Sequence, residues 1–561
     1  MVLWIKKHKT KLVFLLASCI LALLFTLPYL MKDLLPIEHD TFFHLSRIEG
    51  LAKAIENKDF LPAIYPDKNN GFGYTSPLFY ADILLTPAAL IHLAGLPLSA
   101  TYKLVIFIET MFAAFAVMCL IYRITKKNSA AIIAATAYTF ANYHITDVYV
   151  RGALGEVQAM IFLPILLEGI YILLYEQDEK QWKCACFSLT VLALTHNLTF
   201  LLSVILCSIF FLIRLSHLKK AVIIAVFKAV ILSFLFSAFF TLPMLEQLSS
   251  NDYYLNYYGT TSDLADGALP LWKYFANTTV FGYSSTALSH DQQMLVNPGY
   301  FLTFAPLLYI FAKEKKPFIT TCMVPGYIFL LLPSDIIPWD MLSFLRILQF
   351  PWRFIQLSML LLTIPAAYAF TNLCHKKAVH SIVISLLVIE GIWHVLPVTS
   401  RTFGLTSDMT WSDVTDGALT DPYYSATYMR VELAGGDYLP LSSPDYRELS
   451  PVIMDENMEP TDIPFERQYN TLEFTIDSET TNKEIVLPRT WYKGYTIVDE
   501  AGNDISCYQN DYGLVSFTPE TSGTYTCYYK STPLRNCSII ISVISFLLFA
   551  CYTLYKKRHH A

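Results

Sequence analysis

Long apolar runs separated by short basic clusters limit the fold of this chain more than any other feature. The 561 residues are 54% hydrophobic and 15% charged, whereas an average soluble domain has about 25% charged residues. The Lys and Arg residues gather in clusters such as 6–11, 123–127, 214–220 and 313–316, each beside an apolar run. Apolar surface on this scale needs lipid, so the sequence predicts a multi-pass protein of the cell membrane with no nucleic-acid partner.

The basic clusters also orient the predicted helices. About 20 apolar residues cross a bilayer, and loops rich in Lys and Arg face the cytoplasm. These rules predict about twelve transmembrane helices with both termini in the cytoplasm. The predicted spans are residues 12–31, 101–122, 129–147, 158–175, 184–197, 199–213, 221–245, 299–312, 317–333, 353–373, 379–397 and 537–555. A further run, 77–96, is predicted to be re-entrant or surface-lying, because a full span there would place the basic loop at 126–127 outside; the alternative is that it does cross.

The composition changes between residues 399 and 535, where the long apolar runs stop. This stretch holds 22 Asp and Glu residues against 9 Lys and Arg residues, so we expect it outside the membrane. Strand-like segments appear at 469–476, 484–487, 495–498 and 514–518, and turn signals separate the later ones. These features predict a β-rich domain, most simply a sandwich. Cys507 and Cys527 fall within it, in a compartment that permits a disulfide between them.

The predicted organisation has three parts. Residues 1–398 form an all-α polytopic membrane domain with two long outer loops, 32–100 and 246–298. Residues 399–535 form the extracytoplasmic β-sandwich-like domain. Residues 536–561 are a final transmembrane helix with a basic cytoplasmic tail. Outer loops of this length are usually functional or disordered.

The first candidate site follows the first span, in the sequence Ile-Glu-His-Asp-Thr-Phe-Phe-His at 37–44. Glu38, His39, Asp40 and His44 offer two carboxylates and two imidazoles within seven residues. Such groups can act as a general base or bind a divalent metal. The alternative is that Asp40 only caps the helix that begins there.

The second candidate site lies between two predicted spans, at residues 143–156. Asp147, Arg151 and Glu156 are expected to face the same outer cavity as Asp40. An arginine there can hold a phosphate with two parallel hydrogen bonds. The alternative is a structural ion pair between Arg151 and Glu156.

Ionisable residues also interrupt the apolar runs. His196 breaks one run, Arg353 opens another, and Glu390 and His394 lie within a third. Such groups are costly at membrane depth and indicate functional sites. The alternatives are a simple turn at His196 and an Arg353 side chain that reaches the headgroups.

Several of these motifs resemble known families. Gly-Phe-Gly-Tyr-Thr-Ser-Pro-Leu-Phe-Tyr at 71–80, Tyr-Val-Arg-Gly-Ala-Leu-Gly-Glu at 149–156, Leu-Thr-His-Asn at 194–197 and Phe-Pro-Trp-Arg at 350–353 resemble bacterial membrane proteins labelled 6-pyruvoyl-tetrahydropterin-synthase-related. The label does not describe an activity here, because the three-histidine zinc arrangement of that synthase is not seen. Residues 491–499 and 515–518 resemble the C-terminal β-domain of YfhO-type membrane proteins. Both groups share an architecture with C-type glycosyltransferases.

The resemblance implies roles for the candidate residues. Asp40 would be the catalytic base, and Glu38 or His39 would assist it or help hold a divalent metal. Asp147 and Glu156 would be second acids, and Arg151 or Arg353 would neutralise the phosphate leaving group. His44 and His196 would contact substrate. No acidic triplet of the oligosaccharyltransferase kind is present, so metal dependence is not implied by the motif.

The function implied is transfer of a sugar from a polyprenyl-phosphate donor to a cell-envelope polymer or glycolipid on the outer face of the membrane. Two other classes fit the same residues. A transporter or flippase of lipid-linked precursors would use His196, Arg353 and Glu390 as a polar path. A non-catalytic envelope scaffold would bind a partner through its acidic β-domain.

Overall fold

The computed structural model describes residues 2–31, 35, 38–256, 264–276, 294–404, 435–446 and 449–559. These residues group into two compact units, each discontinuous in sequence. The first unit comprises Met1–Thr41, Ser99–Ser233 and Gly259–Thr410, and the second comprises Phe42–Leu98, Phe234–Tyr258 and Trp411–Ala561. Parts of the predicted outer loop 246–298 and of the predicted β-rich domain 399–535 lie outside the residues that the structure describes.

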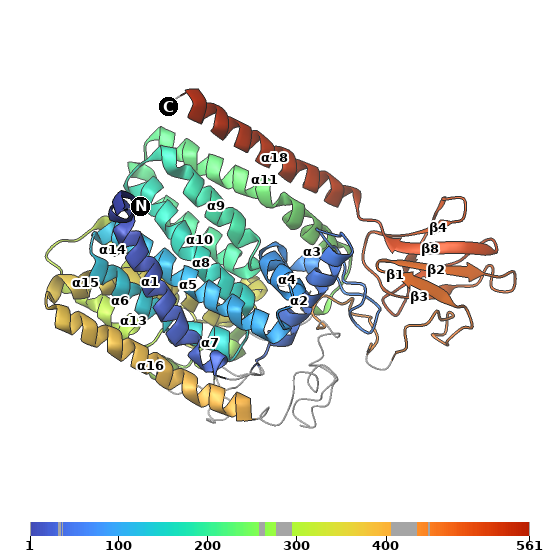
Figure 1. The fold of residues 1–561 in the computed structure, drawn as a ribbon, viewed down its shortest axis with the longest axis horizontal. Coiled ribbons are helices and arrows are strands. Elements are labelled where there is room, and N and C mark those ends of the chain that lie inside the picture. The colour runs from blue at the N-terminus through green and yellow to red at the C-terminus, as the bar shows by residue number, and fades with distance from the viewer. Residues whose placement is uncertain are drawn as a thin grey trace. The chain divides into compact units, whose positions relative to one another are not determined.

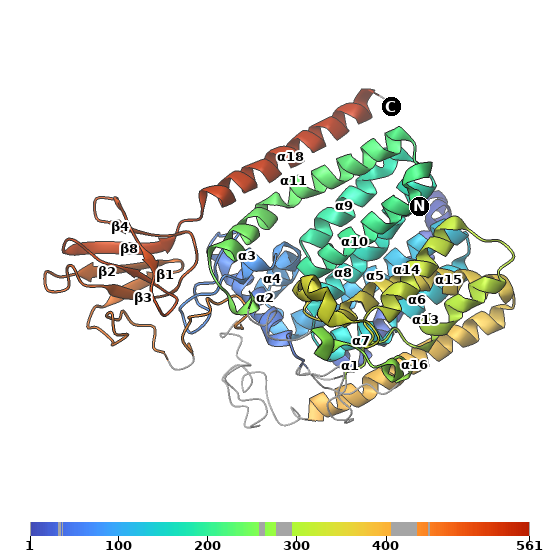
Figure 2. The ribbon, with the colours of Figure 1, turned by 180° about the vertical axis from the view of Figure 1, so that it is seen from behind.

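The first unit is a bundle of helices (Figure 1). Helices α8, α9 and α10 run side by side, as the view from behind also shows (Figure 2). The helices of this unit are α1 (Val2–Leu30), α5 (Leu98–Thr125), α6 (Asn128–Thr139), α7 (Asn142–Tyr149), α8 (Leu154–Ile170), α9 (Trp182–Ala193), α10 (Asn197–Arg214), the first part of α11 (Lys220–Ser250), α13 (Tyr300–Phe304), α14 (Pro317–Leu331), α15 (Phe354–Leu373) and α16 (Lys377–Gly404).

Eight helices of the described residues are long and apolar enough to cross a membrane. They coincide with eight of the twelve predicted spans, and α18 (Pro533–His559) of the second unit contains the last of them. The other four predicted spans correspond to shorter helices. α9 has 12 residues, α14 has 15, and residues 300–311 form α13 followed by the 3₁₀ helix η8 (Ala305–Phe311). The chain is thus a helical membrane protein, and the exact number of crossings stays a prediction.

The predicted span 129–147 is divided into two helices. α6 ends at Thr139 and α7 begins at Asn142, with Ala141 in an extended conformation between them. The ring nitrogen Nδ1 of His144 lies 2.8 Å from the carbonyl oxygen of Thr139. This contact satisfies a carbonyl group that the break would otherwise leave unpaired in an apolar setting.

Small residues allow the central helices to pack closely. α15 is the most deeply buried of the candidate spans: 94% of its most apolar stretch is buried inside the protein. A side chain at Gly326 of α14 would lie 2.8 Å from Leu362 of α15, and one at Gly169 of α8 would lie 2.9 Å from the backbone of Ala185 in α9. Glycine at these positions lets helix backbones approach, as is usual in membrane proteins.

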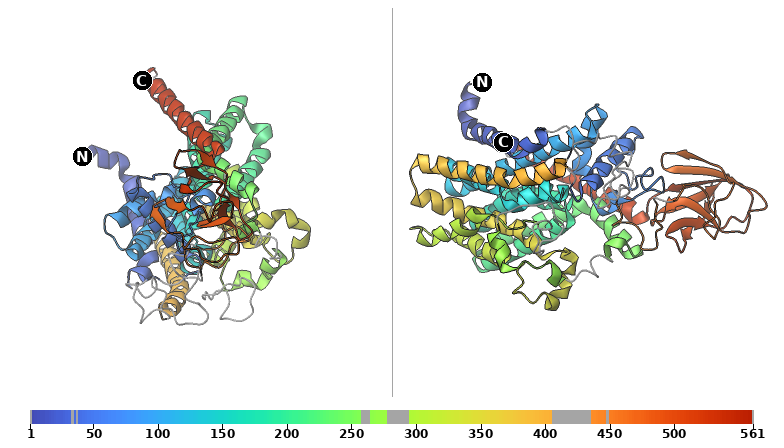
Figure 3. Two further views of the ribbon diagram at one scale, coloured as in Figure 1. Left: turned by 90° about the vertical axis from the view of Figure 1, so that its right-hand side faces the viewer. Right: turned by 90° about the horizontal axis from the view of Figure 1, so that it is seen from below.

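The second unit contains all the strands of the described residues, gathered in one region (Figure 3). One antiparallel sheet has the order β1-β2-β8-β4-β5 and the other the order β3-β7-β6. The two sheets contact each other through Phe474 and Phe517, whose rings lie 5.8 Å apart. The strands are β1 (Phe465–Gln468), β2 (Thr471–Ile476), β3 (Ile485–Thr490), β4 (Tyr495–Asp499), β5 (Asp504–Ile505), β6 (Tyr508–Gln509), β7 (Leu514–Phe517) and β8 (Gly523–Tyr529).

Burial alternates along β2, where Leu472, Phe474 and Ile476 are buried and Glu473 and Thr475 between them are exposed. This alternation is what a strand with one buried face requires. The four predicted strand segments correspond to β2, β3, β4 and β7. The chain therefore has a strand-rich C-terminal region.

The segment 63–79 packs into the core of the strands. The backbone N–H of Thr490 donates to the carbonyl oxygen of Phe72 at 2.8 Å, and the guanidinium of Arg489 donates to the carbonyl oxygen of Gly71 at 2.7 Å. Phe72 and Tyr74 are fully buried in this core. A segment predicted as part of an outer loop of the membrane domain thus belongs to the same compact unit as the sheets.

The apolar run 77–96 forms short helices. α3 (Ser76–Phe79), the 3₁₀ helix η1 (Ile83–Leu85) and α4 (Thr86–Leu93) have four, three and eight residues. None of them is long enough to cross a bilayer, and they follow α2 (Thr41–Glu56) in the same unit. The second part of α11, from Phe234 on, lies beside α18 in this unit (Figures 1 and 2), where the Ser542 hydroxyl donates to the carbonyl oxygen of Leu235 at 2.8 Å.

Cys507 and Cys527 are both free thiols. Cys527 lies opposite Ile497 of β4, and the thiol of Cys507 contacts the carbonyl oxygen of Tyr495 on the same strand. β4 therefore separates the two cysteines. Two strand spacings amount to about 9.5 Å, beyond the roughly 7 Å that a disulfide can bridge between Cα atoms.

Candidate functional site

The motif at 38–40 lies against the turn that follows α7. The backbone N–H of His39 donates to the carbonyl oxygen of Val150 at 3.1 Å, and that of Asp40 donates to the carbonyl oxygen of Arg151 at 2.8 Å. Both segments belong to the first unit. The two sequence motifs, more than 100 residues apart, are thus joined through their backbones.

Gly152 allows this close approach. Its φ of +60° lies in the left-handed region, which favours glycine. A Cβ atom there would lie 2.5 Å from Oγ1 of Thr41 and 3.0 Å from Cβ of Glu38. Any larger residue would push the 38–41 segment away from the turn.

Glu38 is the buried acid of the motif, with 1% of its surface exposed. The Tyr29 hydroxyl donates to Oε1 at 2.5 Å, and the Thr41 hydroxyl donates to Oε2. Burial raises the pKa of Glu38 to about 8, although both hydrogen bonds oppose this rise. A carboxyl group with a pKa near neutral can exchange a proton under working conditions.

Asp40 and His39 differ from Glu38 in their exposure. Asp40 is exposed at the surface. His39 is half-buried, and burial together with the nearby charge of Arg151 lowers its pKa to about 3. The His39 ring is therefore neutral at physiological pH. Among Glu38, His39 and Asp40, only Asp40 is an acid on an exposed residue, so it is the candidate for the general base.

Two acids and two arginines form a buried cluster beside this turn. Arg151 forms an ion pair with Asp147 through Nη1, and its Nη2 donates to Oε1 of Glu156 at 2.8 Å. Nε of Arg353 reaches the same Glu156 oxygen at 3.3 Å. The Tyr143 hydroxyl donates to the other Glu156 oxygen at 2.8 Å. The two positive and two negative charges balance, as buried charges must.

The cluster answers two of the alternatives from the sequence. The ion pair between Arg151 and Glu156 exists, and it is one part of a larger network. Arg353 is 6% exposed and lies in the cluster rather than reaching out to headgroups. Removing one partner of such a buried network typically costs about 3–5 kcal/mol.

Neutral side chains hold the cluster in place and extend it. The guanidinium of Arg151 lies over the Trp352 ring, 4.6 Å from its centroid. The Gln356 amide donates to the backbone carbonyl of Glu156 at 3.1 Å, and its carbonyl oxygen accepts from the Thr199 hydroxyl at 2.9 Å. The ring of His196 contacts Thr199 and caps the start of α10. His196 thus forms a turn, as one alternative predicted, and also joins the polar network.

The structure brings together eight of the nine predicted site residues. Seven are in the motif or the cluster, and His196 is connected through Thr199. His44 belongs to the second unit, where its ring lies 3.1 Å from the Arg47 guanidinium. The proposed substrate contact of His44 stays a prediction.

The donor set does not fit a metal site. Among the described residues, no group of three or more His, Cys, Asp and Glu side chains lies close enough to hold a metal ion. The oxygens of Glu38 already accept hydrogen bonds from Tyr29 and Thr41, and those of Glu156 are taken by two arginines and Tyr143. We therefore derive no step that passes through a metal.

Sequence reasoning missed four contacts that shape the site. Tyr29 and Tyr143 bond the two buried glutamates, Trp352 supports Arg151, and Gln356 positions Glu156. Tyr29 lies at the end of a span, where tyrosine usually anchors the interface. Gln356 was the more informative signal, because a polar residue one turn after Arg353 faces the same side of the helix.

Comparison with known proteins gives distant likenesses. No family model matches the chain. An uncharacterized protein of Lactococcus lactis subsp. cremoris (strain MG1363) is 25% identical over 224 residues, which are 38% of this chain and 36% of the relative. The arabinofuranosyltransferase AftD from Mycobacteria has a TM-score of 0.48 and 11% identity, over 94% of this chain and 40% of that one. The oligosaccharyltransferase AglB from Archaeoglobus fulgidus, in complex with an inhibitory peptide and a dolichol-phosphate, has a TM-score of 0.39 and 12% identity, over 82% and 62%.

This chain covers less than two thirds of each of these three proteins. At these identities the comparisons assign it to no family. Its function has to be argued from the residues of the site.

Proposed function

We propose that this protein is a membrane glycosyltransferase that moves a sugar from a polyprenyl-phosphate donor to a cell-envelope polymer or glycolipid. The observation that carries the proposal is the backbone pairing of Asp40 with Arg151, next to the cluster that Arg151 and Arg353 form on Glu156. Asp40 is thus an exposed acid on a segment that lies against the turn carrying Arg151, whose guanidinium shares Glu156 with that of Arg353. The resemblance noted in the sequence motifs points to the same chemistry.

The reaction would be a single displacement at the anomeric carbon. The acceptor hydroxyl oxygen attacks that carbon, and its proton passes to the carboxylate of Asp40. The bond between the anomeric carbon and the phosphate oxygen breaks, and its electron pair leaves with the polyprenyl phosphate. Arg151 and Arg353 would stabilise the charge that develops on the leaving phosphate, which is often the largest single contribution to catalysis.

Glu38 would act as a positioning residue in this scheme. Its carboxyl group is buried and bonded to Tyr29 and Thr41, so it holds the start of the 38–41 segment. Gly152 permits the approach of this segment to Arg151. The geometry of Asp40 is thus set by residues that would not touch substrate.

Asp40→Asn is the decisive substitution, because it keeps the shape of the side chain and removes its basicity. Membranes containing each variant would be supplied with undecaprenyl phosphate carrying a radiolabelled hexose. We expect transfer of label by the natural protein and by the control Asp252→Asn, an exposed aspartate of the second unit, and none by Asp40→Asn. Equal yield in detergent would show that the variant inserts and folds.

Other outcomes distinguish the alternatives. An active Asp40→Asn variant refutes the role of Asp40 as the base. Movement of labelled donor across sealed vesicles without transfer to any polymer favours the flippase. Neither transfer nor movement in the natural protein favours the scaffold.

A further inference from the structure

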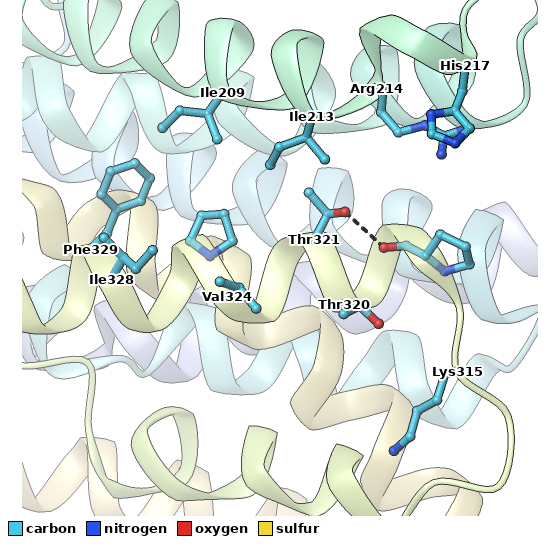
Figure 4. A pocket seen from close by; sticks show the side chains of 12 residues that line it. Ile209, Ile213, Arg214, His217, Lys315, Thr320, Thr321, Val324, Ile328 and Phe329 are labelled. Carbon is cyan, nitrogen blue, oxygen red and sulfur yellow. Dashed lines mark hydrogen bonds between the residues drawn. The ribbon is translucent and has the colours of Figure 1, made fainter.

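A groove runs along the surface of the first unit between α10 and α14, away from the site described above (Figure 4). Its volume is about 660 Å³, within the range of about 300–1,000 Å³ that is usual for sites of small molecules. All its lining residues belong to the same compact unit. The groove is therefore defined by neighbouring helices whose relative positions are fixed.

One end of the groove is apolar. Ile213, Val324 and Ile328 line it and are 50%, 56% and 55% exposed. Ile213 lies on α10, a candidate transmembrane span, and the other two lie on α14, a shorter apolar helix. Exposed aliphatic side chains on such helices need a hydrocarbon partner.

The other end is basic: Figure 4 shows Arg214 and His217 close together on the α10 side and Lys315 apart from them, beside the start of α14. Arg214, His217 and Lys315 line this end. The guanidinium of Arg214 lies over the Tyr175 ring, 4.7 Å from its centroid, and Nζ of Lys315 donates to the carbonyl oxygen of Ile310 at 2.7 Å. These contacts hold the two cations in place.

The charge at this end is not balanced by nearby acids. Among the described residues, neither Arg214 nor Lys315 forms an ion pair with a carboxylate. Nearby Arg123, by contrast, is paired with Glu168 and Glu176. An anion is the group that would complete the basic end.

We propose that the groove binds an anionic membrane phospholipid. Its phosphate would lie at Arg214, His217 and Lys315, and an acyl chain would lie along Ile213, Val324 and Ile328. A soluble phosphate would leave the apolar end uncovered, and a zwitterionic headgroup would bring its own cation to the basic end. Both sides of the basic end lie in loops that the sequence predicts to be cytoplasmic, where anionic lipids attract basic residues. The proposal is independent of the glycosyltransferase reaction.

The test measures lipid retention by the full chain in detergent. Phosphatidylglycerol or phosphatidylcholine is added, and bound lipid is counted by native mass spectrometry. The double variant Arg214→Gln/Lys315→Gln should bind phosphatidylglycerol about 30-fold more weakly, which is about 2 kcal/mol for two charges. The matched control Lys376→Gln/Lys377→Gln removes the same charge from two exposed positions outside the groove and should leave binding unchanged.

A second variant tests the apolar end without changing charge. Val324→Trp should fill the groove and displace the lipid. Val230→Trp places the same side chain on α11, at a position that is 48% exposed and outside the groove, and should have no effect. Agreement of both pairs of variants would support one lipid that uses both ends.

Three results would overturn the proposal. Equal retention of phosphatidylcholine and phosphatidylglycerol would show that the charge does not select the lipid. An equal loss in the control variants would show a non-specific effect. Displacement of the bound lipid by millimolar glycerol phosphate alone would show that a free phosphate occupies the basic end.

Discussion

Replacing Gly152 by alanine tests how closely the 38–41 segment approaches the turn after α7. A non-glycine residue in the left-handed region costs about 1–2 kcal/mol. The added Cβ would also lie 2.5 Å from Oγ1 of Thr41, so Thr41 must move and its hydrogen bond to Glu38 is weakened. The Glu38 carboxyl group is mainly neutral at pH 7, and a hydrogen bond between neutral groups contributes about 0.5–1.5 kcal/mol. We therefore expect Gly152→Ala to destabilise the protein by about 2–3 kcal/mol.

Gly502→Ala is the matched control for this prediction. Gly502 has a φ of +82°, and no heavy atom lies within 4 Å of the position its Cβ would take. Its substitution carries the backbone cost of about 1–2 kcal/mol without the steric one. The assay compares denaturant midpoints of both variants in the same detergent, together with sugar transfer. If Gly152→Ala were no more destabilising than Gly502→Ala, the close approach of the two segments would be refuted.

Three further predictions concern the pH response, the topology and the strand-rich region. Burial raises the pKa of Glu38 to about 8. The folded chain therefore binds more protons than the unfolded chain between about pH 4.5 and 8, and the free energy of unfolding falls as pH rises through that window. Glu38→Gln should remove this slope, so its thermal midpoint relative to the natural protein should rise from pH 5 to 8; parallel curves would contradict the cause. Cysteine labelling should place the loops at Lys126 and Lys315 inside and Asp455 outside, and exterior labelling at Lys126 would invert the topology. A fragment of residues 399–535 should unfold at lower urea than the same fragment linked to residues 58–82, since only the latter restores the buried Phe72 and Tyr74; equal midpoints would show that the segment adds nothing to the core.

Local patterns explain which parts of the fold were predictable. Unbroken apolar runs gave eight helices that match eight predicted spans, and alternating polarity gave β2. No proline or glycine marks the break between α6 and α7 in the sequence. The contact of His144 with the Thr139 carbonyl oxygen accompanies the break, and it is visible only in the structure. The packing of segment 63–79 onto the strands arises from contacts across more than 400 residues, which no local pattern carries.

The same distinction applies to the site. Asp147 and Arg151 are one helical turn apart, so their pairing could be foreseen. Arg353 in an apolar run indicated that it needs a partner, but the sequence did not indicate which acid. The burial of Glu38, next to an exposed Asp40, could not be predicted either, because it depends on where Tyr29 and Thr41 lie.

The pairing of Arg353 with Glu156 spans 197 residues, and this separation has a consequence for biogenesis. When the ribosome has released α7 and α8 into the translocation machinery, the nascent chain holds Asp147 and Glu156 against the single cation Arg151. Its second guanidinium arrives only after α9 to α14 have been synthesised. Until then the cluster itself holds one more acid than base. Arg353, which immediately precedes α15, supplies the missing cation, so the cluster can be completed only late in synthesis.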